Sequence, residues 1–481
     1  MQSRSSNGGS RMIKFGTGGW RAIIGDEFTK KNVQILTAAL CTMMHDEGVI
    51  EKGICIGYDR RFLSKEASKW VAEVCVGAKV PCMVLDKEAP TPLIMHTVRN
   101  LKLPYGLAIT ASHNPALYNG IKIFTEGGRD ASKEVTDEVE KYINKVCCSN
   151  IPIIPYKDAV SRKLVNEINP FNEYIDSIIS LVDVDAIKDK GLKIALDPMY
   201  GVSRTSLQTL LLTARCDVEV IHDRHDTLFG GRLPSPTLQT LSALSRFVVE
   251  SGCDIGLATD GDADRIGVID NKGKFLHPNK LLVLLYYYLL KYRGWKGPAV
   301  RNNSTTHLLD CIAESFDEYC YEVPVGFKHI SSKMEETNAL IGGESSGGMT
   351  VRGHIPGKDG IYAAMLLVEM EARTGKKLSQ IYDEITTQYG EVRMYDADVT
   401  MTSTDKKHLM NLLFDKKAVP DFPYEVEKIS YLDGCKVYFN NGGWVICRFS
   451  GTEPLLRICA EMPDKMQAKN CVETWVSFLN L

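Results

Sequence analysis

Hydrophobic and polar residues alternate along this chain in blocks that predict strands followed by helices. Short apolar runs with the length of a buried strand occupy residues 53–57, 193–196 and 298–301. A polar turn follows each run, and segments with helical spacing begin near residues 64, 203 and 306. Strands that alternate with helices are typical of α/β domains with largely parallel sheets. The pattern therefore predicts three similar three-layer α/β domains.

The chain from residue 391 onward has a different pattern. Strand-like runs occupy residues 392–401, 436–439, 443–449 and 456–460, and helical spacing occupies 404–414 and the end from 464. Strands framed by helices predict a small α+β domain. We therefore expect domain I at 12–160, domain II at 161–272, domain III at 273–390 and domain IV at 391–481. Residues 1–11 are interpreted as a disordered tail or a cloning remnant.

Length and charge narrow the class of protein. A chain of 481 residues has room for three or four domains. Lysine and arginine total 57 against 60 aspartates and glutamates, a net charge of -3. Such a balance gives no general attraction to nucleic acid or acidic membranes, so we expect neither as a partner. Any bound anion must be held by local groups, and the sequence makes no prediction of oligomeric state.

The apolar runs and the cysteines favour a cytoplasmic protein. The longest apolar run, residues 281–290, is too short for a bilayer, which needs about 20 residues, and is expected to be a buried helix. The N-terminus lacks the apolar segment of a secretory signal. The 14 cysteines include no CxxC pair and lie mostly in apolar runs, which predicts reduced thiols. A disulfide framework is the alternative.

The first loop with candidate chemistry is TASHNP, residues 110–115, after an apolar strand-like run. The proline and the polar residues predict an exposed turn that presents Ser112. A serine hydroxyl is a weak nucleophile unless it is activated or already carries a transferable group. The GxSxG motif of α/β hydrolases is absent. The alternative is a polar loop in which Ser112 and Asn114 only cap the backbone.

The second loop, DGDADR at residues 260–265, predicts a cation site. Asp260, Asp262 and Asp264 stand at alternate positions, and like charges so close are costly without a neutralising cation. An EF-hand is excluded because Arg265 replaces its glycine, Asn271 replaces its glutamate, and both flanks are strand-like. Mg²⁺ is favoured over Ca²⁺, which usually takes more ligands. The alternative is an exposed acidic turn.

The third loop is rich in glycine, which allows a ligand to approach the backbone closely. It comprises GGESSGG at 342–348 and GHIPGKDG at 353–360. Glu344 and Ser346 are candidates to bind sugar hydroxyls. The second segment is not a Walker A loop, since it is one residue short and Asp359 replaces the serine or threonine. A mobile surface loop is the alternative.

Two further segments are candidate phosphate sites. In RFSGTEPLLR, residues 448–457, Arg448, Ser450, Thr452 and the N–H groups near Gly451 could cradle a phosphate. An ordinary turn between strands is the alternative there. In FGTGGWRA, residues 15–22, Arg21 is a candidate phosphate ligand, with a solvated arginine as the alternative.

Taken in this order, the loops make the sequence resemble the α-D-phosphohexomutase (phosphoglucomutase/phosphomannomutase) family from residue 15 to about residue 479. Smaller matches support the resemblance: GYDRR at 57–61, PTP at 90–92 and GGRLPSP at 230–236. The resemblance implies three α/β domains and a smaller C-terminal domain around one central cleft.

The resemblance also implies roles for the matching residues. Ser112 would be the phosphoserine, and Mg²⁺ would be held by Asp260, Asp262, Asp264 and an oxygen of the Ser112 phosphate. The catalytic residues would be Ser112, Arg21, His113 and Lys122, the last as general acid and base. The substrate-binding residues would be Arg265, Lys328, Gly343, Glu344, Ser346 and Lys358. The site for the phosphate that is not reacting would comprise Arg448, Ser450, Gly451, Thr452 and Arg457.

The implied activity interconverts hexose 1-phosphate and hexose 6-phosphate. A hexose 1,6-bisphosphate, which also serves as activator, would reorient between two phosphoryl transfers, and domain IV would move on a hinge. VGFKHI at 325–330 favours glucose, with mannose as the alternative, over glucosamine or a pentose. A metal-dependent phosphatase with a serine nucleophile and a non-catalytic sugar-phosphate-binding protein are the competing functions.

Overall fold

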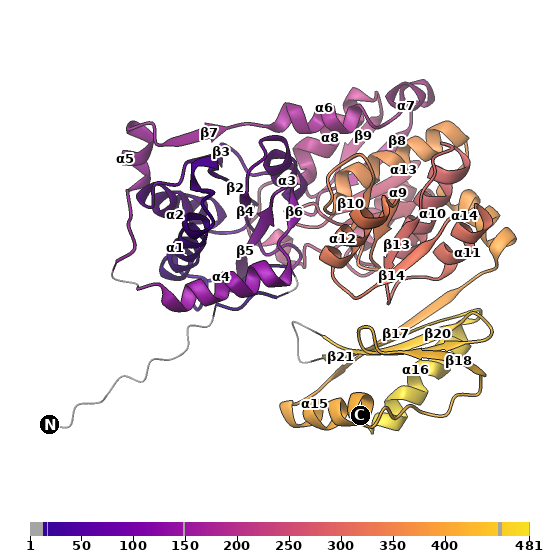
Figure 1. The fold of residues 1–481 in the computed structure, drawn as a ribbon. Coiled ribbons are helices and arrows are strands. Elements are labelled where there is room, and N and C mark those ends of the chain that lie inside the picture. Colours follow the sequence, from indigo (N-terminus) through magenta and orange to yellow (C-terminus); the bar gives the residue numbers. More distant parts are fainter. Residues whose placement is uncertain (1–12, 17, 148–149, 451–454, 481) are drawn as a thin grey trace.

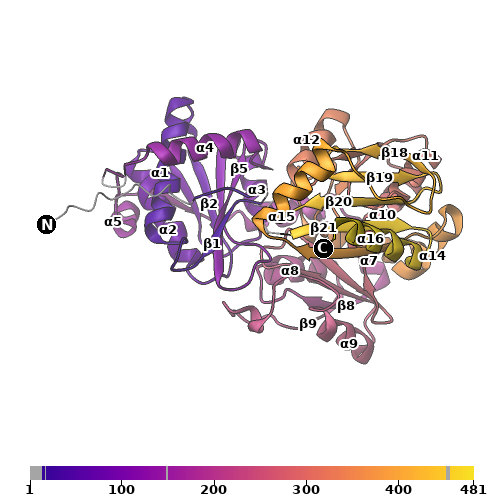
Figure 2. The same ribbon diagram turned by 90° about the horizontal axis from the view of Figure 1, so that it is seen from below.

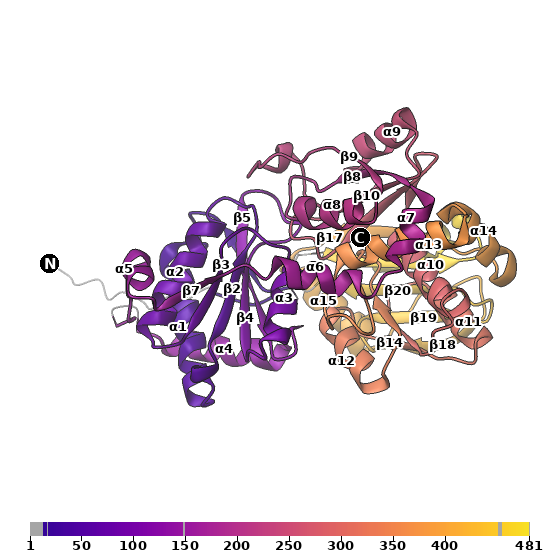
Figure 3. The ribbon, with the colours of Figure 1, turned by 90° about the horizontal axis from the view of Figure 1, so that it is seen from above.

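The computed structural model describes residues 13–16, 18–147, 150–450 and 455–480, and these form four sheets with their helices (Figure 1). Three sheets are mixed parallel and antiparallel, and the fourth is antiparallel throughout. The prediction of three α/β domains and a smaller C-terminal α+β domain is confirmed. Seen from above, the first sheet occupies one end of the molecule, and the second and third domains lie side by side at the other (Figure 3).

The first sheet has the order β1-β5-β4-β2-β3-β7, and β6 pairs with β5. Its strands are β1 (Trp20–Ile23), β2 (Ile54–Tyr58), β3 (Cys82–Leu85), β4 (Tyr105–Ile109), β5 (Tyr118–Thr125), β6 (Arg129–Asp130) and β7 (Val165–Ile168). Its helices are α1 (Lys30–Asp46), α2 (Ser64–Gly77), α3 (Thr91–Asn100), α4 (Lys133–Lys145) and α5 (Tyr156–Ser161), with a short 3₁₀ turn at Ile50–Lys52. Strand β7 follows the expected domain boundary at residue 160 but pairs with β3 of this sheet.

The second sheet has the order β12-β11-β10-β8-β9. Its strands are β8 (Lys193–Asp197), β9 (Asp217–Val220), β10 (Ile255–Thr259), β11 (Ile266–Asp270) and β12 (Phe275–Leu276). The helices of this region are α6 (Phe171–Ile179), α7 (Val184–Lys190), α8 (Ser203–Thr213) and α9 (Ser242–Ser251), with a 3₁₀ turn at Phe229–Gly231. Strands β10 and β11 are antiparallel neighbours, so the acidic loop between them is a tight connection at one end of the sheet.

The third sheet has the order β14-β13-β15-β16. Its strands are β13 (Ala299–Asn302), β14 (Cys320–Val323), β15 (Ile341–Gly343) and β16 (Met349–Val351). The helices are α10 (Pro278–Lys291), α11 (Leu308–Ser315), α12 (Phe327–Thr337), α13 (Gly360–Thr374) and α14 (Leu378–Tyr389). The predicted buried helix at 281–290 is confirmed as the central part of α10, whose side chains there are all buried.

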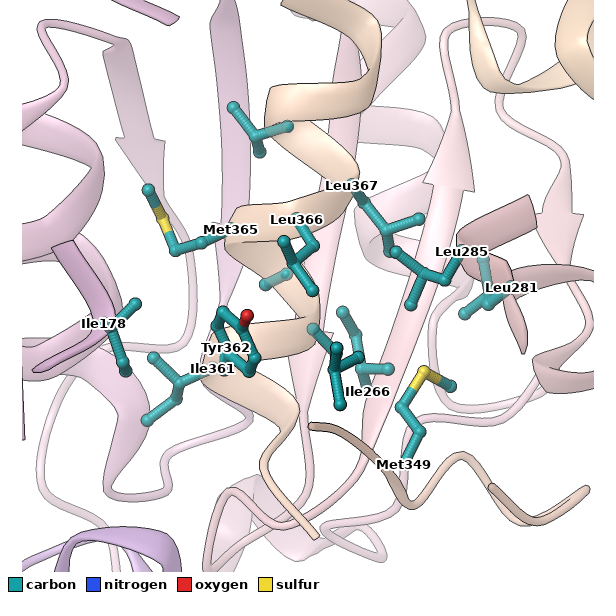
Figure 4. Packing of buried hydrophobic residues seen from close by; sticks show 14 of the residues in the cluster. Ile178, Ile266, Leu281, Leu285, Met349, Ile361, Tyr362, Met365, Leu366 and Leu367 are labelled. Carbon is teal, nitrogen blue, oxygen red and sulfur yellow. The ribbon is translucent and has the colours of Figure 1, made fainter. Parts of the chain in front are cut away.

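Helix α13 joins the second and third domains into one hydrophobic core. It packs on α7, α8 and the strands β10 and β11 of the second sheet, and on α10 and β16 of the third domain. Figure 4 shows Ile178 of α6 on one side of α13 and Leu285 of α10 on the other. Twelve of its fifteen residues are buried, so α13 is buried almost all round, as expected of a helix between two layers.

The C-terminal domain is a five-stranded antiparallel sheet with the order β17-β21-β20-β19-β18. Its strands are β17 (Arg393–Thr400), β18 (Val426–Ser430), β19 (Cys435–Phe439), β20 (Trp444–Phe449) and β21 (Leu455–Met462). Its helices are α15 (Ser403–Met410), which continues into a π-helical turn at Asn411–Asp415, and α16 (Lys465–Leu479). Helix α16 covers one face of the sheet, and the other face lies against the third domain (Figures 1 and 2).

No helix in the part of the chain that the structure describes is both long and apolar enough to cross a membrane.

Candidate active site

Ser112 lies in the connection from β4 to β5, against the acidic loop 260–265 of the second domain. Its φ of +52° is a left-handed conformation that non-glycine residues adopt rarely, often at functional sites. The Thr110 hydroxyl accepts a hydrogen bond from the Ser112 N–H at 2.8 Å, and Ser112 Oγ donates to Asp260 Oδ2 at 2.8 Å. The prediction of an exposed turn is wrong: only 1% of Ser112 is exposed. The loop that covers it comes from another domain, which local sequence does not reveal.

Arg61 holds the loop that carries Ser112 (the serine loop) in place by donating hydrogen bonds to the backbone carbonyl groups of that loop. Its guanidinium donates to the carbonyl oxygens of Ser112, Asn114, Pro115 and Tyr118 over 2.5–3.1 Å. The group lies on the Phe229 ring at 4.9 Å. The sequence singled out GYDRR only as a motif match and assigned Arg61 no role. The usable signal was the second of two adjacent arginines directly after a buried strand.

Replacing Arg61 with lysine is expected to lower both stability and turnover. The guanidinium has a planar fork of five donors that reaches four carbonyl groups, whereas a lysine ammonium has three donors at one point. We expect a loss of about 2–4 kcal/mol in the free energy of unfolding, since buried acceptors lose charged donors. We expect kcat to fall about 10- to 100-fold from misplacement of Ser112. Urea unfolding and steady-state kinetics measure the two effects.

The neighbouring residue provides the control for this variant. Arg60 is equally buried, but its two hydrogen bonds, to Glu88 and to the Asp223 carbonyl, are both 3.3 Å long. Arg60→Lys should therefore change kcat much less than Arg61→Lys. Equal losses in the two variants would mean that Arg61 acts only as a buried charge and does not position the serine loop.

The three aspartates of the loop between β10 and β11 form a candidate metal site. Asp260, Asp262 and Asp264 are the one cluster of its kind among the described residues, with ligand atoms within 4.8 Å of one another. All three are buried, and the Oδ1 atoms of Asp262 and Asp264 have no hydrogen-bond partner. Buried carboxylate oxygens without donors suit a hard cation such as Mg²⁺. The residues present therefore fit the expected metal.

Close packing brings this loop onto the serine loop. A Cβ added at Gly261 would lie 2.9 Å from the Ser112 carbonyl oxygen, which is closer than side-chain carbons approach. Thr91, at the start of α3, holds Asp262 through both its N–H at 3.0 Å and its hydroxyl at 2.7 Å. Thr91 belongs to the PTP match, but the sequence assigned it no role. Gly261 leaves room for the loop that carries Ser112, and Thr91 binds Asp262, so the acidic loop can lie directly against the first domain.

Lys122 lies on β5 of the first domain and connects that domain with the acidic loop 260–265. Its Nζ donates to Asp262 Oδ2 and to Asp264 Oδ2, both at 2.6 Å. Burial lowers the pKa of Lys122, but the two carboxylates more than offset this, so the pKa is raised overall. Lys122 is thus a protonated side chain at the centre of the site.

The aspartates themselves differ in charge environment. Burial, followed by repulsion from Asp262 and Asp264, raises the pKa of Asp260 well above its usual range. Burial opposes ionisation of Asp264 too, but Lys122, Lys358 and Arg265 hold the pKa of that carboxyl well below its usual range. Asp260, the residue that accepts from Ser112 Oγ, is therefore the aspartate whose ionisation the other two carboxylates oppose.

A cavity of about 700 Å³ lies next to this centre and extends to the C-terminal domain. Seven of its lining residues are basic and two are acidic, Asp130 and Glu344. Such an excess of positive charge favours an anionic ligand. The cavity lining contains ten of the predicted residues: Arg21, His113, Lys122, Arg265, Glu344, Ser346, Lys358, Arg448, Ser450 and Arg457.

Several groups around the cavity are fixed by one another. Arg21 Nη1 donates to Asn114 Oδ1 at 2.5 Å, and His113 Nδ1 lies 3.3 Å from Ser112 Oγ. The positive charge of Arg265, together with burial, lowers the pKa of His113 well below its usual range. These cavity residues contact the buried groups: His113 lies beside Ser112, and Lys122 donates to Asp262 and Asp264.

The glycine-rich loop at residues 342–348 is anchored to two neighbouring segments. Glu344 Oε1 accepts from the Gly326 N–H at 3.2 Å and from Asn302 Nδ2 at 3.4 Å. Arg265 and Gly348 form a short backbone bridge, which joins the glycine-rich loop to the acidic loop 260–265. Glu344 and Ser346 therefore face the cavity from a supported loop and not from a mobile one.

Two of the predicted substrate-binding residues are not among the described residues that line the cavity. Gly343 faces the core, since a Cβ there would lie 2.6 Å from Leu282 Cδ1. Lys328, at the start of α12, interacts electrostatically with Glu134 of α4 and is not in the cavity lining. Sequence proximity to cavity residues Phe327 and Glu344 does not decide where a side chain points. Gly451 and Thr452 lie outside the described residues.

Comparisons with known proteins match this chain over nearly its whole length. The models for domains I, II and III (alpha/beta/alpha) and the C-terminal domain of "Phosphoglucomutase/phosphomannomutase" match residues 12–147, 172–273, 277–389 and 409–476. A phosphoglucomutase/phosphomannomutase of Thermococcus kodakarensis is 31% identical over 97% of this chain and 98% of its own. A phosphoglucosamine/phosphogalactosamine mutase of Sulfurisphaera tokodaii is 30% identical over 95% and 97%. The crystal structure of parafusin, a phosphoglucomutase from Paramecium, has a TM-score of 0.81 at 20% identity, covering 99% of this chain and 95% of its own, and shares the fold.

Proposed function

Since this chain belongs to the phosphoglucomutase/phosphomannomutase family, we propose that it is the phosphohexomutase that interconverts glucose 1-phosphate and glucose 6-phosphate, with mannose phosphates as the alternative substrates. The observation that carries this proposal is the placement of Ser112. Its hydroxyl donates to Asp260 of the metal loop, beside a basic cavity that reaches Arg448 and Arg457 in another domain. A nucleophile at one end and arginines at the other suit a substrate with a phosphate at each end.

Ser112 is the residue proposed to carry the transferable phosphoryl group. In the first transfer the bond from phosphorus to Ser112 Oγ breaks, and a bond forms from phosphorus to the free hydroxyl of the hexose monophosphate. Phosphoryl transfer depends mainly on positioning and on neutralising the phosphoryl oxygens. Arg61 provides the positioning through the loop carbonyls, while Arg21, Arg265 and Lys358 supply positive charge from the cavity wall.

Asp260, Asp262 and Asp264 would hold Mg²⁺, together with an oxygen of the phosphorylated Ser112. When bound, the ion supplies Lewis-acid stabilisation of the negative charge on the phosphoryl group. Lys122 is proposed as the general acid and base. It is protonated between two of these aspartates and lines the cavity, so it can protonate the serine oxygen as the bond to phosphorus breaks. The neutral amine that this leaves can accept the proton that the attacking hydroxyl loses, which restores the ammonium.

The second transfer requires the 1,6-bisphosphate to turn end over end. Arg448, Ser450, Gly451, Thr452 and Arg457 are proposed to hold whichever phosphate is not reacting. Glu344 and Ser346 would bind hydroxyl groups near the middle of the sugar, which remain in similar positions after the turn. The cavity volume of about 700 Å³ gives the sugar room for this motion when domain IV opens on its hinge.

A phosphatase with a serine nucleophile is the competing reaction. It needs the metal loop and Ser112 but no second phosphate site. The arginines of domain IV that line the same cavity favour the mutase. Release of inorganic phosphate as fast as isomer formation would reverse this choice.

The relatives differ in the hexose that their names specify, since they include phosphoglucosamine mutases at about 30% identity. The hexose is therefore tested with a coupled assay containing Mg²⁺ and a trace of glucose 1,6-bisphosphate. Glucose 1-phosphate, mannose 1-phosphate and glucosamine 1-phosphate are the three substrates. We expect kcat/KM to fall in that order, because 325–330 (VGFKHI) is similar to glucose-specific members. Turnover of glucosamine 1-phosphate above the other two would replace the substrate assignment, and no turnover of any would refute the proposed activity.

A further inference from the structure

Asp433, in the turn between β18 and β19, connects domain IV with domain III through one carboxylate oxygen. Its Oδ2 accepts from Arg448 Nε at 2.9 Å, within domain IV, and from the Val325 N–H at 2.9 Å, in domain III. A third contact crosses the same boundary, since Nδ2 of the buried Asn303 donates to the Asp433 carbonyl oxygen at 2.8 Å. Asp433 does not line the cavity, so its effect must pass through its partners.

Both partners of the Asp433 carboxylate lead to the ligand cavity. Arg448 lines it, and because Asp433 uses the Nε donor, the Nη1 and Nη2 donors are kept for an anion. Val325 lines it as well, and the next amide along the chain, that of Gly326, donates to Glu344 Oε1 at 3.2 Å. Two adjacent backbone amides thus bind both sites: the Val325 N–H donates to Asp433, beside the proposed phosphate site, and the Gly326 N–H donates to Glu344, in the proposed sugar site.

The turn that carries Asp433 is packed tightly onto strand β20. Gly434 has a φ of +91°, which favours glycine, and a Cβ there would lie 2.6 Å from the Cys447 carbonyl oxygen and 2.9 Å from Arg448 Cβ. The turn therefore cannot shift without moving Arg448. On the domain III side, Gly326 also has a positive φ, of +125°. Both ends of the connection are set by backbone geometry.

We infer that Asp433 is a positioning residue that aligns the phosphate-binding Arg448 of domain IV with the sugar-binding Glu344 of domain III when the two domains close. The inference rests on the proposed function. A phosphate held by Arg448 is held equally before and during transfer at the distant reacting centre. Loss of Asp433 should therefore weaken substrate binding and leave the chemical step nearly unchanged.

Steady-state kinetics of Asp433→Ala test this inference. We expect KM for the hexose phosphate to rise about 10- to 100-fold, as for loss of a hydrogen bond to a charged group, while kcat stays within about threefold. Asp433→Asn keeps an oxygen acceptor and should raise KM less. Asp421→Ala removes an exposed carboxylate of the same domain and should leave both constants unchanged.

A double-mutant cycle shows whether Asp433 acts through Arg448. In the Arg448→Ala background, Asp433→Ala should change KM by no more than about twofold, because the residue it positions is gone. The rate at which phosphorylated enzyme loses its phosphate to water should match that of the wild type in every variant, since water needs no phosphate site. A merely structural role would change that rate and would persist in the Arg448→Ala background.

The outcomes separate this inference from the proposed function. Mutase turnover by the wild type with an unchanged KM in Asp433→Ala would overturn the inference and leave the function standing. A fall in kcat with an unchanged KM would also overturn it. Absence of turnover in the wild type would refute the function. Calorimetric titration with glucose 6-phosphate measures the affinity independently of turnover, and it should weaken by the same factor as KM rises.

Discussion

Replacing Ser112 with alanine is expected to lower kcat by at least about 10⁴-fold, as for loss of a covalent nucleophile. The same variant should carry no phosphate on the peptide that contains residue 112. The physical reason is that the variant lacks the hydroxyl that lies 2.8 Å from Asp260 Oδ2 and beside His113 Nδ1. Stopped assays at high enzyme concentration and peptide mass spectrometry measure the two effects.

Ser332→Ala is the matched control, because Ser332 is an exposed serine on helix α12. It should retain wild-type kcat and the phosphate on residue 112. Ser112→Ala should retain the wild-type unfolding midpoint within a few degrees, since it deletes one hydroxyl. A phosphate that persists in the Ser112→Ala protein on another residue, together with substantial turnover, would show that the nucleophile is misassigned.

Removing divalent metal with a chelator is expected to lower kcat by about 10²- to 10⁴-fold, and added Mg²⁺ should restore it. Asp260, Asp262 and Asp264 are buried in one cluster, and the Oδ1 atoms of Asp262 and Asp264 have no hydrogen-bond donor, so a bound cation would take the place of donors there. Mg²⁺ should also raise the melting temperature, because a ligand that binds only the folded state stabilises it by mass action. Differential scanning calorimetry of the apo and Mg²⁺-loaded protein measures this shift.

Asp262→Asn tests whether Mg²⁺ acts on stability and on turnover through the same loop, residues 260–265. It should lose both the Mg²⁺-dependent rise in melting temperature and most of the turnover. Asp433→Asn makes the same chemical change outside the metal loop and should keep the full thermal response to Mg²⁺. Full activity in chelated protein, with less than one metal ion per chain by elemental analysis, would contradict a metal-dependent mechanism.

Sequence patterns predicted the secondary structure well where apolar residues are periodic. The run at residues 281–290 predicted a buried helix, and α10 confirms it. Strand β18 was not predicted, because four of its five residues are exposed and it lacks alternating apolar residues. An exposed edge strand is stabilised by its pairing with β19, and that pairing leaves no mark in its own sequence.

The candidate site was predicted less evenly. The loops with dense chemistry, TASHNP and DGDADR, were found because their residue types are informative at short range. The residues that support them were not: Arg61, Thr91 and Asp433 act on loops that are distant in sequence or belong to another domain. Lys328 is the opposite case, since it was predicted to bind substrate and is adjacent in sequence to cavity residue Phe327, but it is not in the cavity lining.

The sequence by itself predicted the elements with periodic apolar residues, the order of the four domains and the candidate chemistry of each loop, because these depend on short-range periodicity and on the charges of adjacent residues. Only the tertiary structure decided which loops meet. It placed Ser112 under Asp260, 148 positions away in the chain, and joined domains II and III through α13. It also placed Arg448 in contact with Asp433 at the boundary with domain III. These contacts depend on how buried faces of separate domains pack together, and no local pattern specifies that.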